Sequence, residues 1–170
     1  KIDALVRDLT TQKQESQIQA LLDAVRREEM PAAQAMRYVD RTLKTVRRIG
    51  MKDGDDASQL RTLSSIGESY ELLGGLEQAF GVYQEALEVA RRLKDHAAEA
   101  NLLWKMGRVG RKRNRWDEAL QHLRQGRSIY EDLEDQQGIA RCRISQGIVD
   151  FERGDCPAAT EAYEQALEVG

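Results

Sequence analysis

The sequence predicts an all-α solenoid of antiparallel helix pairs, because three sets of residues repeat along it at a spacing of 40 positions. A fixed period of roughly 20 to 50 residues is typical of stacked helical units, each of which packs only on its neighbours. The repeating residues are one glycine, one alanine and one bulky residue per unit: Gly67, Gly107 and Gly147; Ala79, Ala119 and Ala159; Tyr83, Leu123 and Tyr163.

Each unit is predicted to be a helix, a tight turn and a second helix, because a turn signal lies between its glycine and its alanine. These signals are Gly74-Gly75, Asn114-Arg115 and Gly154-Asp155, and glycine and asparagine tolerate the left-handed conformation that ends a helix. The predicted helices are 57–73 and 76–93, then 97–113 and 117–133, then 137–153 and 157–169. Pro157 suits the start of the last helix, where its missing N–H has no intrahelical acceptor to lose.

A degenerate fourth unit precedes the three clear ones. Pro31 opens a helix whose apolar residues align with those of 76–93 at an offset of 44, and the helix before it carries Ile18, Leu21, Leu22 and Val25. We therefore expect one continuous solenoid, with an N-terminal helix and degenerate repeat in 1–56 and repeats at 57–96, 97–136 and 137–170. The apolar stripe from Ile2 to Leu9 predicts one long N-terminal helix, which either caps the array or ends a coiled segment from further upstream.

The first clear unit resembles the tetratricopeptide repeat family. It reads Leu63-x2-Ile66-Gly67-x2-Tyr70, then Ala79-x3-Tyr83 and Ala86-Leu87. The resemblance covers about residues 16 to 170, and the period of 40 in place of 34 is similar to the longer-helix subclass of signalling adaptors and bacterial regulatory proteins. It implies a right-handed superhelix that binds partners on a concave face formed by the first helix of each unit. Ser64, Glu68 and Ser145 stand where the family's carboxylate clamps have other residues, so that specificity is not implied.

Composition narrows the classes of function. The 170 residues include 32% charged residues of both signs, interspersed, with a net charge of -3, which gives no general attraction to nucleic acid or to an anionic membrane. No apolar run approaches the roughly 20 residues that span a bilayer. Cys142 and Cys156 are expected to be free thiols of a cytoplasmic protein. Because the chain lacks an initial methionine and stops inside a predicted helix, we expect it to be part of a longer protein.

The sequence shows no recognisable catalytic, metal or cofactor site. Its two histidines, His96 and His122, are interpreted as solvated surface residues, and neither has a nucleophile partner in an evident motif. Their spacing and that of the two cysteines match no usual set of metal ligands. The turn Gly74-Gly75 lacks the context of a phosphate-binding loop. We therefore predict that the protein is not an enzyme and needs no cofactor.

The predicted binding surface consists of residues on the first helices. Segment 105–115 holds six cations, which indicates either a solvated helix with cations at its C-terminal end or a wall that pairs with acidic groups of a peptide. Trp104 follows a filled core position, so its indole either contacts a partner or packs under the adjoining repeat. The candidate partner-binding residues are Arg61, Asn101, Trp104, Lys105, Arg108, Arg111, Lys112, Arg141, Ile144 and Ile148.

The first helix of the third unit departs from the pattern. Arg143, Gln146 and Asp150 occupy expected core positions, while apolar residues follow one or two positions later: Ile144, Ile148 and Phe151. Either this helix is rotated by about 100°, the turn of one residue, or the groove becomes apolar here. The second alternative would make a site that is cationic at one end and apolar at the other.

These observations predict a protein–protein interaction scaffold that binds a peptide or helix of a partner, acidic or amphipathic, as part of a larger regulatory or signalling protein. Self-association into a homo-oligomer through the last helix or the Ile2–Leu9 stripe is an alternative. RNA binding through the 105–115 cations is a weaker alternative, because helical-repeat RNA readers use every repeat and this cluster occurs in one.

Overall fold

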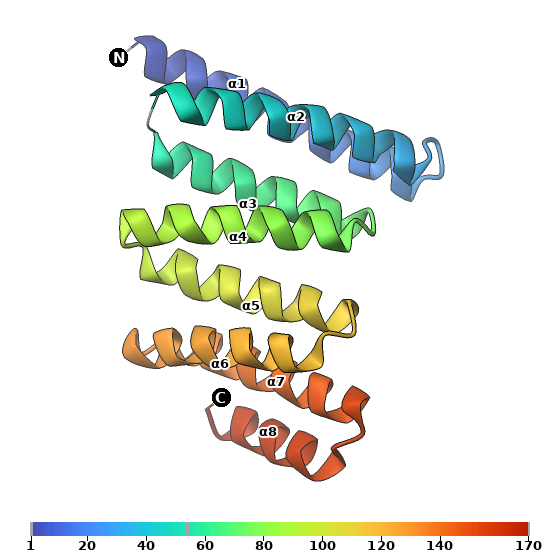
Figure 1. Cartoon of the computed structure of the whole chain (residues 1–170), viewed down its shortest axis with the longest axis vertical. Coiled ribbons are helices and arrows are strands. Elements are labelled where there is room, and N and C mark those ends of the chain that lie inside the picture. Colours follow the sequence, from blue (N-terminus) through green and yellow to red (C-terminus); the bar gives the residue numbers. More distant parts are fainter. Residues whose placement is uncertain (1, 54, 170) are drawn as a thin grey trace. The chain divides into compact units, whose positions relative to one another are not determined.

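The computed structural model describes residues 2–53 and 55–169, with side chains described for 12–48 and 55–169. This part of the chain contains eight α-helices and no strand (Figure 1). Two compact units are present, Lys1–Val89 and Ala90–Gly170, and the boundary between them falls inside the fourth helix. Each unit is described by itself below.

The helices are close to those expected from the sequence. In the three clear units, each helix begins and ends within one residue of its predicted bounds. The eight helices are α1 Ile2–Arg26, α2 Ala32–Asp53, α3 Asp56–Leu72, α4 Leu76–Leu93, α5 His96–Lys112, α6 Trp116–Asp132, α7 Gln136–Arg153 and α8 Cys156–Val169. α1 is the single long N-terminal helix that was predicted, although the side chains of the Ile2–Leu9 stripe lie outside the described ones.

Polar residues set where the helices begin and end. Asp55, Asp95 and Asp135 cap α3, α5 and α7 by accepting a hydrogen bond from the backbone N–H three residues later, at 3.2, 3.0 and 2.9 Å. The turns inside the repeats use the left-handed conformation where the sequence predicted it, for example at Gly154 with φ 90° and at Asn114 with φ 57°. The capping aspartates also recur every 40 residues, so each repeat carries its own start signal.

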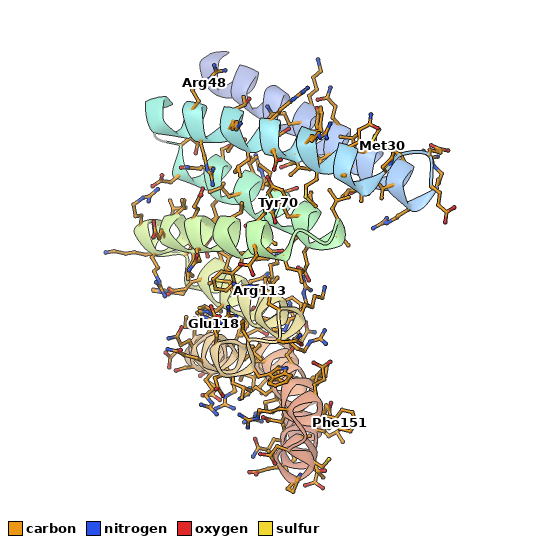
Figure 2. All side chains as sticks on the ribbon, turned by 45° about the vertical axis from the view of Figure 1, so that its right-hand side comes forward. Met30, Arg48, Tyr70, Arg113, Glu118 and Phe151 are labelled. Carbon is orange, nitrogen blue, oxygen red and sulfur yellow. The ribbon has the colours of Figure 1, made fainter. Side chains whose placement is uncertain are left out.

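In unit Lys1–Val89, aromatic side chains join the helices. The Tyr83 ring from α4 lies directly over Gly67 of α3, so closely that a Cβ at Gly67 would stand 2.4 Å from the ring. The Tyr83 hydroxyl donates to the buried Glu71 carboxylate at 3.2 Å. The Tyr70 hydroxyl, near the centre of Figure 2, donates to Asp40 of α2 at 2.5 Å. These two rings fill the space between helices and are almost completely buried.

In unit Ala90–Gly170, α5 pairs with α6 and α7 pairs with α8, and α7 also packs on both α5 and α6. One apolar cluster joins Ala119, Leu120 and Leu123 of α6 to Val149 of α7. A second joins Ala100 of α5 and Tyr130 of α6 to α7; its α7 members are Ile139 and Cys142. The first helix of the third unit is therefore held by two separate contacts.

The first explanation offered for α7, a rotation by one residue, is wrong. Gln146 and Asp150 are buried in the core positions that the repeat assigns to them, whereas Ile144 is exposed. Their polar groups are satisfied there: Arg127 Nη1 donates to Gln146 Oε1 at 3.0 Å, and Arg153 Nη2 lies 3.4 Å from Asp150 Oδ1. Because the polar residues find partners, the helix keeps its register and its apolar residues turn outward.

The fold class is the predicted one, an all-α helical-repeat solenoid. The degenerate first repeat also packs as its apolar pattern predicts, because these residues are buried: Ile18, Leu22, Val39 and Leu43. Two further points stay predictions. One is that the superhelix is right-handed, and the other is that the chain forms one continuous solenoid with segments at 1–56, 57–96, 97–136 and 137–170.

The close approach at Gly67 gives a test of the repeat contact. We expect Gly67→Ala to lower the free energy of unfolding by about 1–3 kcal/mol, because the new methyl group would overlap the buried Tyr83 ring. Gly81→Ala in the same unit is the matched control: nothing lies within 4 Å of a Cβ there, so the better helix former should stabilise by about 0.5–1 kcal/mol. Urea denaturation followed by circular dichroism measures both, and equal effects would contradict the packing account.

Candidate partner-binding site

A pocket of about 250 Å³ opens in unit Ala90–Gly170 between α5 and α7, with α6 behind it. It brings together six of the ten predicted partner-binding residues: Trp104, Arg108, Arg111, Arg141, Ile144 and Ile148. Gly107, Leu123 and Val149 form apolar parts of its wall, and Ser145 contributes a hydroxyl. The lining is therefore mainly apolar with three guanidinium groups.

Trp104 is the centre of this arrangement. Two cations lie over its ring, with the Arg108 Cζ 4.7 Å and the Arg141 Cζ 4.9 Å from the ring centroid. Its indole N–H donates to Ser145 Oγ at 2.9 Å. The ring also packs against both apolar clusters that join α7 to its neighbours. Trp104 thus packs under the adjoining repeat, which is one of the two alternatives raised by the sequence, and it also lines the pocket. Its contact with a partner stays a prediction.

Arg111 is paired inside the protein. Its Nη1 lies 2.6 Å from Oε1 of Glu152, which comes from the last turn of α7. Both side chains are partly exposed, so solvent screens the pair and its contribution to stability is small. A ligand carboxylate that reached Arg111 would compete with Glu152 for the same guanidinium group. Glu152 therefore lowers the net positive charge that the pocket offers.

The remaining predicted residues lie elsewhere. Asn101, Lys105 and Lys112 belong to α5 but do not line the pocket, although Asn101 is half-buried and its Oδ1 is a buried atom with no hydrogen-bond partner. Arg61 belongs to α3 in the other unit, where its Nε lies 3.8 Å from Glu15 Oε1. Their role in binding stays a prediction.

The cations of segment 105–115 do not form one continuous wall. Arg108 lies over Trp104, and Arg111 lies against Glu152. Arg113 lies 3.8 Å from Glu118 of α6, and both residues are labelled in Figure 2. Three cations of this segment thus meet three different neighbours. This divergence follows from the helical turn of about 100° per residue, which a count of charges along the sequence ignores.

Sequence reasoning missed Glu152 as part of the site. Two polar contacts that connect α5 to α7 here, Trp104 to Ser145 and Arg111 to Glu152, both join residues 41 positions apart. This separation is one repeat period plus one residue. A search for complementary residues at that offset could have found both partners from the sequence.

The histidines are only partly as expected. His96, the first residue of α5, is exposed as expected. The interpretation of His122 as a solvated residue is wrong, because its side chain is only 18% exposed and lies 3.9 Å from Glu118. Burial lowers the pKa of His122, and the carboxylate of Glu118 opposes this.

The described part of the chain holds no group of three or more His, Cys, Asp or Glu side chains placed to bind a metal ion. None of its described helices is both long and apolar enough to cross a membrane. The pocket's chemistry is that of a binding surface: cations, an aromatic ring and aliphatic walls.

The chain is similar to one protein family and to several solved structures. The family model described as "Tetratricopeptide repeat" matches residues 58–132. Among solved structures, BtubC from P. vanneervenii is similar with a TM-score of 0.70 and 17% identity over 91% of this chain and 61% of that one. The tetratricopeptide repeat domain of Arabidopsis FLU is similar with a TM-score of 0.63 and 21% identity over 66% of this chain and 95% of that one.

A third similar structure is aspartyl phosphate phosphatase F from Bacillus subtilis, with a TM-score of 0.70 and 12% identity over 94% of this chain. The chain spans 40% of the length of that protein and 61% of BtubC. No curated protein sequence matches this chain. At these identities the likeness concerns the fold alone.

The pocket helix α7 offers a chemical test of its packing through Cys142. This thiol is fully buried, and burial raises its pKa to about 12, whereas Cys156 is exposed. Since the thiolate is the reactive form, we expect Cys142 to react with iodoacetamide at pH 8 at least about a hundredfold more slowly than Cys156. Mass spectrometry of the Cys156→Ser variant isolates Cys142, and rapid labelling without denaturant would contradict the described packing of α7.

Proposed function

Because this chain belongs to the tetratricopeptide repeat family, whose fold generally mediates protein–protein interaction, we propose that it is a non-catalytic scaffold that binds a partner peptide in the α5–α7 pocket. The partner segment is acidic and hydrophobic, either extended or an amphipathic helix. We also propose that the chain is part of a larger regulatory or signalling protein of the cytoplasm.

The observation that carries the proposal is that the guanidinium groups of Arg108 and Arg141 both lie over the indole of Trp104. Stacking on the ring holds both cations in place, so less side-chain entropy is lost when a ligand binds them. A carboxylate of the ligand can pair with these guanidinium groups, while an apolar side chain beside it enters the wall formed by Ile144, Ile148 and Trp104. A ligand with an acidic residue next to an apolar one can therefore contact both the guanidinium groups and the apolar wall of the pocket.

The position of the pocket in the repeats supports the same conclusion. Its charged and aromatic residues all come from α5 and α7, which are the first helices of two successive repeats. In the family this face generally receives partner proteins. RNA binding has less support, because the cations of segment 105–115 diverge and two of them face the carboxylates of Glu152 and Glu118.

Charge reversal in the pocket tests this function. We expect Arg108→Glu to weaken binding of a fluorescein-labelled peptide that alternates Asp or Glu with Leu or Phe by about ten- to a hundredfold, because a charge-assisted hydrogen bond becomes a repulsion. Fluorescence polarisation measures the affinity. Circular dichroism should show unchanged helix content, since Arg108 is not a core residue.

Arg115→Glu is the matched control, because Arg115 is exposed, lies outside the pocket and undergoes the same change of charge. It should leave the affinity within about twofold. Equal losses in both variants would show that binding follows net charge alone. Retention of single-stranded RNA at physiological salt, abolished by Arg108→Glu, would instead support the nucleic-acid alternative.

Glu152→Gln tests the internal competition for Arg111. Removal of the carboxylate frees the guanidinium group of Arg111 for the ligand, so we expect the same acidic peptide to bind several-fold more tightly. The gain should shrink as salt is raised, because both partners of the pair are partly exposed. Weaker binding in Glu152→Gln would show that the ion pair helps to shape the pocket.

A further inference from the structure

The outward side of α2, in unit Lys1–Val89, carries a row of exposed cations. The row is called the α2 stripe below and consists of Arg37, Arg41, Lys44 and Arg48. Intervals of four, three and four residues place these side chains on one side of the helix. Arg48, at one end of the stripe, is labelled in Figure 2.

Two carboxylates close to the stripe are engaged by other residues. Asp40, next to the stripe in α2, accepts a hydrogen bond from the hydroxyl of Tyr70 at 2.5 Å. Glu85 of α4 pairs with Arg47, which follows Val46 in α2 and is not part of the stripe. Neither carboxylate therefore neutralises the stripe, although the protein as a whole has a net charge of -3.

The same outer positions are exposed in a later repeat without being basic. The corresponding residues of α6 are all exposed: Gln121, Gln125, Ser128 and Asp132. They are exposed even though α7 and α8 follow in the chain. Neighbouring repeats therefore leave this side of a second helix uncovered, and a solvated helix of this protein does not need cations there.

In α8 these outer positions are acidic. Glu161 and Glu168 correspond to Arg37 and Lys44 of the stripe, and Glu164 lies beside them. All three glutamates are exposed, and α8 contains no basic residue. They are called the α8 acidic face below. The chain thus has a basic row on its second helix and an acidic row on its eighth, at the same place in the repeat.

The two rows are complementary in charge and in spacing. Both lie on α-helices, whose outward residues recur with each turn of about 5.4 Å, so opposed cations and carboxylates stay matched along the helices. The acidic face extends over about 10 Å from Glu161 to Glu168, which is shorter than the stripe. Two stripes would repel each other, as would two acidic faces, so only unlike rows can pair.

Other anionic partners have less support from the stripe. It contains no aromatic side chain on which the bases of a single-stranded nucleic acid could stack. It also contains no apolar side chain that could enter the interface of a membrane. A row of carboxylates on a protein helix satisfies the stripe without either of these, and α8 presents such a row.

We propose that the α2 stripe of one copy of this chain binds the α8 acidic face of a second copy. The contact is head to tail, because each copy keeps one row available for a further copy, and it produces closed rings or open chains. Exposed ion pairs are individually weak, so several form together and the association fades as salt is raised.

Sedimentation velocity of the 170-residue protein tests this self-association. In about 20 mM NaCl, where screening is weak, we expect the weight-average sedimentation coefficient to rise between protein concentrations of about 10 and about 500 μM. In about 0.5 M NaCl it should stay at the value of the monomer. A monomer at every concentration in low salt, or association that salt does not weaken, would overturn the proposal.

Two charge-reversed variants test which rows meet. Arg41→Glu with Lys44→Glu changes only the stripe, and Glu161→Lys with Glu164→Lys changes only the acidic face. Each variant alone should self-associate at least about tenfold more weakly, because like charges become opposed. Mixed in equal amounts, the two should form a 1:1 complex of nearly the original affinity, since one contributes an intact acidic face and the other an intact stripe. Absence of this complex would contradict the head-to-tail pairing.

Lys94→Glu with Arg115→Glu is the matched control. Both residues are exposed, lie outside the two rows and undergo the same change of charge as the stripe variant. The control should leave self-association within about twofold. An equal loss in the control would show that association follows net charge alone, which would also overturn the proposal. Circular dichroism should show unchanged helix content in all these variants, because every substituted residue is exposed.

This proposal and the function proposed for the α5–α7 pocket can fail independently. Arg108→Glu, which weakens peptide binding in the pocket, should leave self-association unchanged. If the protein instead stays monomeric and binds single-stranded RNA at physiological salt, and if only the stripe variant loses that binding, the stripe belongs to a nucleic-acid site and the proposal is wrong.

Discussion

The structure depends on one contact that recurs in each clear repeat, a bulky side chain of the second helix laid directly on a glycine of the first. Tyr83 lies on Gly67 and Leu123 lies on Gly107, with distances to a hypothetical Cβ of 2.4 and 2.6 Å. Any side chain in place of the glycine would separate the two helices. Because the contact fixes both the spacing and the rotation of the pair, it decides which residues face the core and which face outward.

The pocket between α5 and α7 is a consequence of that constraint. Once each first helix is fixed on its own partner, the helices of successive repeats meet through residues one period plus one position apart, as Trp104 meets Ser145 and Arg111 meets Glu152. The same rotation spreads the cations of α5 over several neighbours. A dense run of positive charge in the sequence therefore becomes a small site in which an aromatic ring orders two guanidinium groups.

The third repeat shows how polar residues preserve the pattern. Gln146 and Asp150 stand in core positions that are apolar in an ordinary repeat, and a rotation of α7 would have exposed them. Hydrogen bonding to Arg127 and pairing with Arg153 satisfy them where they are. The apolar residues that follow them turn away from the core: Ile144 and Ile148 line the pocket, and Phe151 is exposed.

The sequence by itself determined the elements of this protein, because helix periodicity, turn residues and the 40-residue repeat are local properties. The helices of the clear units were placed to within one residue, and six of the predicted binding residues do share one pocket. Only the tertiary structure decided the rest: the register of α7, the burial of His122 and the pairing of Arg111 with Glu152. These depend on which side chain of another helix lies opposite, and that is settled by packing in three dimensions.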